Sequence, residues 1–169
     1  MIDARTHVPL ASRAWDAVAA QGAVEEIVED ACAHFDVAGF WPAHPQDGGA
    51  SDGDTSLYLG ASGVIWALHQ LATTGATQRR LAAPLARLLA AARQSRAALG
   101  EYGRHGSLHF GDFPALLVAM RLAPDAAIAD AIHQRASDNN ALPVRELMWG
   151  LPGSMLACVF MHGMTGEAR

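Results

Sequence analysis

One sequence pattern occurs three times in this chain, and it constrains the fold more than any other feature. The copies read SLYLGASGVIWALHQLA at 56–72, SLHFGDFPALLVAMRLA at 107–123 and ELMWGLPGSMLACVFMH at 146–162. Each copy has a leader with leucine, then a glycine, two further residues, a glycine or proline, and an apolar run. Such repetition is typical of repeat architectures, in which one unit buries its apolar face only by packing against its neighbours.

The small residues of each copy predict the start of a helix. A glycine after the leader permits a backbone conformation or a close approach that a Cβ atom would block. Proline is tolerated in the first helical turn, where its missing N–H has no partner within the helix. The motif glycines that shape the three helix starts are Gly60, Gly63, Gly111, Gly150 and Gly153.

The apolar run behind each leader predicts a short inner helix that is buried on every side. None of the three runs reaches the roughly 18 uninterrupted apolar residues of a membrane span. We therefore expect inner helices of a soluble protein that has no membrane partner.

Amphipathic patterns between these runs predict outer helices. The first covers 23–35, the second begins near Pro84, and the third covers about 126–136. The alternating order of outer and inner helices predicts an all-α fold of α/α hairpin repeats, forming part of an (α/α) toroid in a single domain of residues 1–169. Three repeats cannot close a ring, so we expect the N-terminal portion of a longer domain, with apolar surface open at its C-terminal edge.

Composition narrows the possible partners and the location. The formal net charge of -5 is spread without basic blocks, which favours neither nucleic acid nor an anionic membrane as a partner. Two distant cysteines do not make a disulfide framework, so a reducing, cytoplasmic location is expected. The N-terminal residues lack the continuous apolar segment of a secretory signal.

The segment 36–55 is rich in Gly, Pro and Asp, which predicts a long irregular loop. Two interpretations apply to its aromatic residues. In one, Phe40, Trp41 and His44 form part of a binding rim. In the other, which we favour, Phe40 and Trp41 close the end of the helical layer.

The three copies in register resemble the early repeats of the lanthionine synthetase C-like family. The resemblance rests on SLYLGASGVIWAL, SLHFGDFPALLVAMRLAP and ELMWGLPGSMLACVFMHGMTGEAR, and it extends from about Trp15 to Arg169. It implies an α/α toroid and a peptide-modifying cyclase. In such enzymes zinc holds a Cys thiolate of a precursor peptide and the thiolate adds to a dehydroamino acid. A nearby acid then protonates the enolate as the thioether (lanthionine) ring closes.

The zinc ligands implied by this resemblance do not occur in the chain. Zinc that activates a bound thiolate takes S and N ligands and leaves one position open. The family supplies a Cys and an adjacent Cys-His pair in later repeats, and no Cys-His dipeptide is present here. Cys158 and His162 share a helix face at i and i+4, but packing of Cys158 is the favoured interpretation. We therefore expect no cofactor in this chain, zinc only in the full-length family, and no cyclase activity from the chain alone.

The family also places an Asp four residues before the motif glycine of an early repeat, in an acid–base role. The matching positions are Ser56, Ser107 and Glu146, so the resemblance makes Glu146 the candidate acid. A second interpretation, that Glu146 caps the third inner helix, stays open. His109 and Asp112 flank the second motif glycine. They are further candidates to line the mouth of the toroid, where the carboxylate of Glu146 would also lie.

Two other functions remain open. A non-catalytic helical-repeat binding or scaffold protein would keep this fold without the metal chemistry. A carbohydrate-acting α/α toroid enzyme would need a carboxylate pair across its cavity, for which Asp112 and Glu146 are the candidates. The partners expected are a precursor peptide and, through the open C-terminal edge, a second copy of the chain.

Overall fold

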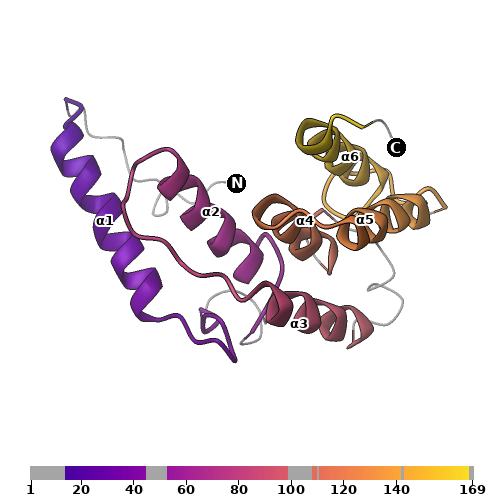
Figure 1. Ribbon diagram of the computed structural model, residues 1–169, viewed down its shortest axis with the longest axis horizontal. Coiled ribbons are helices and arrows are strands. Elements are labelled where there is room, and N and C mark those ends of the chain that lie inside the picture. The colour runs from indigo at the N-terminus through magenta and orange to yellow at the C-terminus, as the bar shows by residue number, and fades with distance from the viewer. Residues whose placement is uncertain (1–13, 45–52, 99–107, 110, 142, 168–169) are drawn as a thin grey trace, which may run out of the picture.

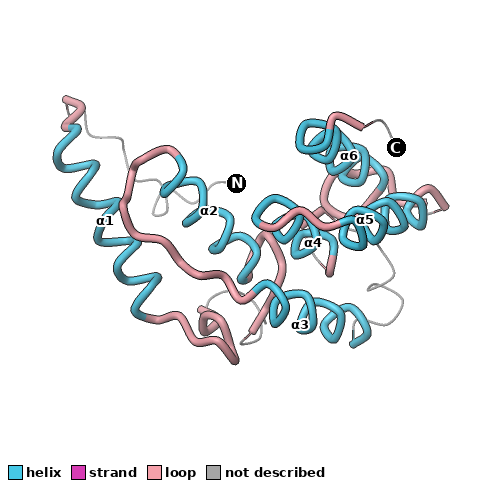
Figure 2. The backbone as a smooth tube through the Cα atoms, viewed as in Figure 1, coloured by secondary structure: helices cyan, strands magenta, loops and turns pink. Residues whose placement is uncertain are grey.

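The structure is a computed structural model, and it describes residues 14–44, 53–98, 108–109, 111–141 and 143–167. The described residues form six α-helices joined by loops, and they include no strand (Figures 1 and 2). The helices are α1 (Ala17–Ala33), α2 (Ala61–Thr73), α3 (Leu85–Ala98), α4 (Phe113–Leu122), α5 (Ala126–Asn139) and α6 (Leu151–Thr165). The all-α prediction is confirmed, and all three motif copies enter a helix.

Helix α4 lies at the centre of the molecule. It packs against α2 and α6, the other two inner helices, and against α3 and α5, which belong to the outer set. Seven of its ten residues are buried. A helix that is apolar nearly all round is stable in water only when neighbours surround it, and α4 meets that condition.

The prediction that every inner helix is buried on all sides is wrong for α6. The buried residues of α6 are the small residues Gly153, Ser154 and Ala157, and its larger side chains Leu156, Met161 and Met164 pack against the second core cluster. On its other side Met155 and Val159 are 61% and 64% exposed. These side chains are exposed because no described element covers that side of α6.

Helices α1 and α2 do not pack directly against each other along their lengths. The segment 74–84 runs between these two helices, as Figure 2 shows, and α1 binds to that segment. The side chain of Gln21 donates to the carbonyl oxygen of Ala76 at 2.6 Å, and the hydroxyl of Thr77 donates to Glu25 at 2.9 Å. The segment that links α2 to α3 is thus bound to α1 and lies between α1 and α2.

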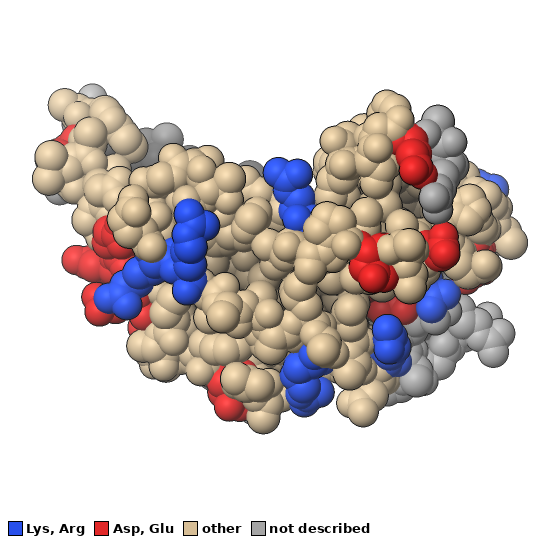
Figure 3. All heavy atoms as spheres, in the orientation of Figure 1, with Lys and Arg blue, Asp and Glu red and all other residues tan. Residues whose placement is uncertain are grey.

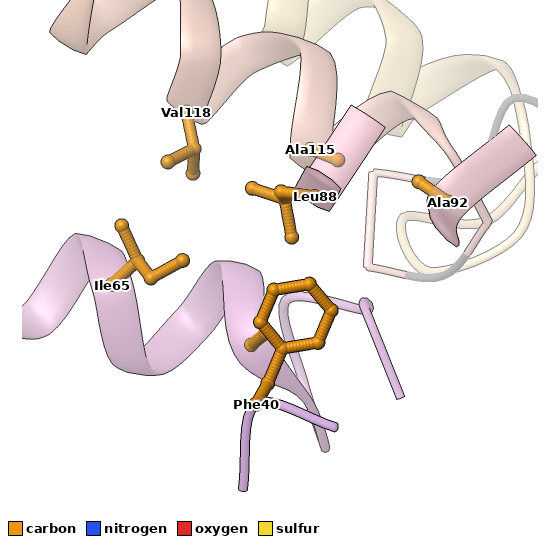
Figure 4. Close-up of a cluster of buried hydrophobic side chains, with 7 residues drawn as sticks. Phe40, Ile65, Leu88, Ala92, Ala115 and Val118 are labelled. Atoms are coloured by element: carbon orange, nitrogen blue, oxygen red, sulfur yellow. The ribbon is translucent and has the colours of Figure 1, made fainter. Parts of the chain in front are cut away.

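The core consists of two clusters of buried side chains. The first joins the loop before α2 to α2, α3 and α4 and is shown in Figure 4. Its members are Phe40, Ala61, Ile65, Leu88, Ala92, Ala115 and Val118. The second joins α4, α5 and α6 around Phe113 and Ile132. Helix α4 contributes to both clusters, so it connects the two halves of the fold.

Phe40 closes the end of the helical layer, which confirms the favoured interpretation of this loop. Its side chain is 1% exposed and its ring points toward Leu88 (Figure 4). Asp36 and Phe40 exchange two backbone hydrogen bonds of 2.8 and 2.7 Å, and the indole N–H of Trp41 donates to the carbonyl oxygen of Ala31 at 2.7 Å. These bonds hold Phe40 at φ 61, a conformation that bulky residues rarely adopt.

Among the described helices, none combines the length and the apolar character that crossing a membrane requires.

Candidate functional site

The three leaders lie close together at one end of the inner helices. We call 56–60 leader 1, the described residues 108, 109 and 111 leader 2, and 146–150 leader 3. The backbone N–H groups of Leu57 and Tyr58 donate to the carbonyl oxygen of His109 at 2.9 and 3.4 Å, which joins leader 1 to leader 2. Leu108 of leader 2 lies against Gly153 at the start of α6. The N-terminal ends of α2, α4 and α6 therefore form one composite surface.

Leaders 1 and 3 fold in the same way, because both pass directly over the first turn of their helix. A Cβ atom on Gly63 would lie inside 3.0 Å of the carbonyl oxygen of Leu57, and one on Gly153 would do the same with Leu147. In both cases the obstructing carbonyl is six residues earlier in the chain. Only glycine leaves room for a main chain at this distance.

The hydrogen bonds at the two helix starts repeat as well. Gly60 and Gly150 are the N-cap residues of α2 and α6, with φ and ψ of -133° and -166° in the first and -128° and -167° in the second. The N–H of the first helical residue in each case donates to a carbonyl oxygen seven residues earlier, at 2.8 Å for Ala61 and 3.4 Å for Leu151. The repeat in the sequence is thus a repeat in three dimensions for these two copies.

Leader 2 ends differently from the other two. Gly111 has φ +78, in the left-handed region, and Asp112 takes the N-cap position of α4. The side chain of Asp112 makes no capping hydrogen bond to the helix. It turns instead toward α5.

Asp112 forms an ion pair with Arg135 of α5. The Nε of Arg135 lies 3.3 and 3.1 Å from the two carboxylate oxygens, and the side chains of Asp112 and Arg135 are 5% and 19% exposed. Arg135 also pairs with Asp138 at 3.2 Å. A carboxylate held this way positions α4 against α5, and it is not accessible to a sugar or peptide at the surface.

Sequence reasoning missed Arg135. It lies 23 residues from Asp112 in an outer helix, and neither spacing nor composition connects the two. A close charged pair between separate helices becomes visible only when their relative position is known.

Replacing Arg135 with methionine is expected to lower the free energy of unfolding by about 2–4 kcal/mol, because the nearly buried Asp112 carboxylate loses its guanidinium partner. The double variant Asp112→Leu/Arg135→Met should recover most of the loss, since both charges are removed together. Arg79→Met is the control, because the Arg79–Glu29 pair is solvent-exposed and worth at most about 1 kcal/mol. Urea denaturation of the four proteins measures the effect. Equal losses at positions 135 and 79 would contradict the assigned role.

Glu146 caps the turn of its own leader. Its carboxylate accepts hydrogen bonds from the backbone N–H groups of Met148 and Trp149, and its side chain is exposed. The helix that follows begins at Leu151, and its N-cap residue Gly150 has no side chain to cap it. Glu146 therefore supports leader 3 and not α6 itself. Its role as an acid remains a prediction.

His109 is half-buried in leader 2, where its backbone oxygen receives the two bonds from leader 1. Its ring meets the ring of Tyr58 edge to face, with the ring centroids 6.5 Å apart. This contact brings an imidazole of leader 2 beside a phenol of leader 1. A catalytic role for His109 also remains a prediction.

The residues that the structure describes include no group of three or more His, Cys, Asp or Glu side chains that could hold a metal ion. The half-buried thiol of Cys158 lines a hollow of about 40 Å³ between α5 and α6, together with Ala129 and Ile132. A ring nitrogen of His162 lies 3.1 Å from the backbone oxygen of Glu167. We derive no chemical step through a metal in this chain.

Exposed apolar side chains accompany the polar candidates on the leaders. Tyr58 and Leu59 protrude from leader 1, and Leu147 and Trp149 protrude from leader 3. Their position at the starts of two repeated inner helices makes this surface the candidate binding site of the molecule.

Comparison with known proteins finds no match: no family model, no curated protein and no solved structure is significantly similar to this chain.

Proposed function

We propose that this chain is a lanthionine synthetase C-like helical repeat unit whose leader surface binds a precursor peptide in the cytoplasm. In this proposal the chain contributes to thioether ring formation by holding the peptide, and it does not carry the zinc chemistry. The single observation that supports it best is the shared geometry of leaders 1 and 3, in which a glycine-dependent loop passes over the first turn of an inner helix.

The arrangement of side chains on the leaders also supports peptide binding. Extended peptides bind through alternating apolar contacts and hydrogen bonds, and the leader surface offers both kinds of group. Trp149 and Tyr58 provide flat apolar contacts that lose little conformational entropy on binding. Glu146 organises the backbone of leader 3 through its two hydrogen bonds, so the surface is formed before a peptide arrives.

Binding of a linear peptide that contains cysteine and dehydroalanine is expected to change the fluorescence of Trp149. The indole is partly exposed on leader 3, so a bound chain would alter its surroundings. Titration of the purified chain measures the change, with an expected Kd in the micromolar range, about 10–100 μM. Trp149→Phe should abolish the signal, and Trp15→Phe, at the exposed start of α1, should retain it. A titration without any response, or one that Trp149→Phe leaves unchanged, would contradict peptide binding at the leaders.

A non-catalytic scaffold is the second candidate function. It is favoured by the structural roles of the acidic candidates, because Asp112 is bound to Arg135 and Glu146 to its own turn. The same environment of Asp112 argues against a carbohydrate-acting enzyme, which needs two accessible carboxylates. A Glu146→Gln variant tests the acid–base role of Glu146. Peptide holding and scaffolding both predict that the variant keeps its function, and only an acid–base role predicts a loss of ring closure in the assembled cyclase.

A further inference from the structure

A cavity of about 120 Å³ lies between α2, the segment 74–84 and the end of α4, and we call it the α2 cavity. Helix α2 lines it with one face, because the contributing residues fall at i, i+3, i+4 and i+7: Ile65, Leu68, His69 and Ala72. Leu81 and Leu122 add aliphatic side chains from the other two elements. No residue of the leaders lines the cavity, so it is distinct from the candidate binding site described above.

The size and the walls of the α2 cavity select a small aliphatic group. A cavity of about 150 Å³ with comparable walls accepts a molecule the size of benzene, so the α2 cavity has room for about five or six heavy atoms. Its aliphatic side chains offer no hydrogen-bond partners to the hydroxyl groups of a sugar, whose burial would then be unfavourable. A branched alkyl chain fits both the volume and the lining.

Arg80 brings a positive charge to the mouth of the α2 cavity. It lines the cavity and is also exposed to solvent. An arginine in this situation packs its stem on apolar surface and keeps its guanidinium in water. Its neighbour Arg79 pairs with Glu29 at 2.9 Å, whereas Arg80 forms no ion pair within the described part of the chain. The charge of Arg80 is therefore available to an anionic ligand.

Acidic side chains do not oppose this charge inside the cavity. Among the described residues that line it, none is Asp or Glu. Figure 3 shows acidic and basic side chains gathered over the part of the molecule around α1, with mostly uncharged surface beside them towards the centre. An anion at the mouth would thus meet a cation without a competing carboxylate in the wall.

His69 is the second polar group of the α2 cavity. Its side chain is half-buried, and its ring lies beside the ring of Trp66 with the centroids 5.9 Å apart. The Nε2 atom is 3.4 Å from the hydroxyl oxygen of Thr73, one turn further along α2. In either neutral tautomer one ring nitrogen of a histidine donates a hydrogen bond. The wall therefore contains a positioned imidazole in addition to the cation at the mouth.

We propose that the α2 cavity binds a small branched aliphatic carboxylate. The alkyl chain lies between α2, the segment 74–84 and α4, and the carboxylate lies at the mouth beside Arg80. Charge complementarity selects the anion, because a cationic ligand would be repelled by the guanidinium and a neutral one would gain nothing from it. The inference does not rest on peptide binding at the leaders, because it uses different side chains.

Titration with isocaproate, followed by amide chemical shifts in NMR spectra, tests the proposal. The shifts should saturate between about 0.1 and 20 mM ligand with a Kd of about 1 mM, as expected for a ligand of this size. Isocaproamide has the same alkyl chain without the charge and should bind about fivefold more weakly. Acetate has the charge without the chain and should give no saturable shift. An absent response to isocaproate, or equal affinities for the acid and the amide, overturns the proposal.

Two matched arginine variants identify the cation. Arg80→Gln should raise the Kd for isocaproate about fivefold, while Arg79→Gln, which removes the arginine paired with Glu29, should leave it unchanged. Ala72→Leu adds a larger side chain to the cavity wall and should abolish binding. Circular dichroism verifies that all three proteins remain helical. Equal effects of the two arginine substitutions, or undiminished binding by Ala72→Leu, would show that isocaproate does not bind in the α2 cavity.

Discussion

Replacing Gly153 with alanine is expected to lower the free energy of unfolding by about 3 kcal/mol or more, and Gly63→Ala should act in the same way. In both proteins the new methyl group would lie inside 3.0 Å of a main-chain carbonyl oxygen of the leader, that of Leu147 or of Leu57. A flexible side chain could move aside, but a carbonyl can move only with the leader that carries it. The leader's bonds to the helix start would then be broken as well.

The matched control lies ten residues further along the same helix. A methyl group on Gly163 meets nothing within 4 Å, so Gly163→Ala should stabilise the protein by about 0.5–1 kcal/mol through helix propensity alone. Chemical denaturation followed by circular dichroism measures all three variants. Two alanine substitutions in one helix with opposite signs would identify the leader contact as the cause. A Gly153→Ala protein as stable as the wild type would show that leader 3 does not pass over α6.

Phe40→Ala is expected to cost about 3–5 kcal/mol of folding free energy. The ring of Phe40 fills the space between α2, α3 and α4 in the first core cluster, and its removal leaves a cavity bounded by helices that are held elsewhere. On the outer side the guanidinium of Arg87 lies 5.9 Å from the ring centroid and donates to the carbonyl oxygen of Ala38 at 2.7 Å. The loop therefore closes over the core as a unit, and its central aromatic ring holds it there.

Val37→Ala is the control for this loop, because Val37 is exposed and its truncation should change stability by no more than about 0.5 kcal/mol. Thermal unfolding should give a clearly lower midpoint for Phe40→Ala alone. If the two variants were equally stable, the loop would be a dispensable rim and the core would not depend on it.

Much of the helical architecture could be predicted from the sequence because its signals are local. The apolar run of the second copy, the amphipathic pattern at about 126–136 and the position of Pro84 predict helices close to where α4, α5 and α3 occur. The glycine pattern predicts the starts of α2 and α6, since Gly60 and Gly150 are the N-cap residues of these helices. These features depend on residues within one or two helical turns of each other. The spacing of apolar and small residues in the sequence therefore predicts them directly.

The candidate site could be predicted only in part. Its location at the leaders follows from the repeated motif. The environments of its polar residues cannot be predicted from the motif, because each depends on a partner or a turn that lies outside the motif or is not apparent from it. Asp112 lies where the sequence predicts a residue lining the mouth of the toroid, yet its side chain is nearly buried in an ion pair with Arg135. Glu146 has the spacing of an acid or a helix cap, yet it binds the turn before the helix.

By itself the sequence determined where the helices begin, which of their faces are apolar, and which glycines must lack a side chain. Only the tertiary structure decided that 74–84 separates α1 from α2, that Phe40 enters the core, and that one side of α6 stays uncovered. The physical reason is the separation along the sequence over which each interaction acts. Helix formation depends on neighbours a few residues apart, whereas burial and ion pairing depend on which distant segments meet, and hydrophobic attraction alone does not specify the partner.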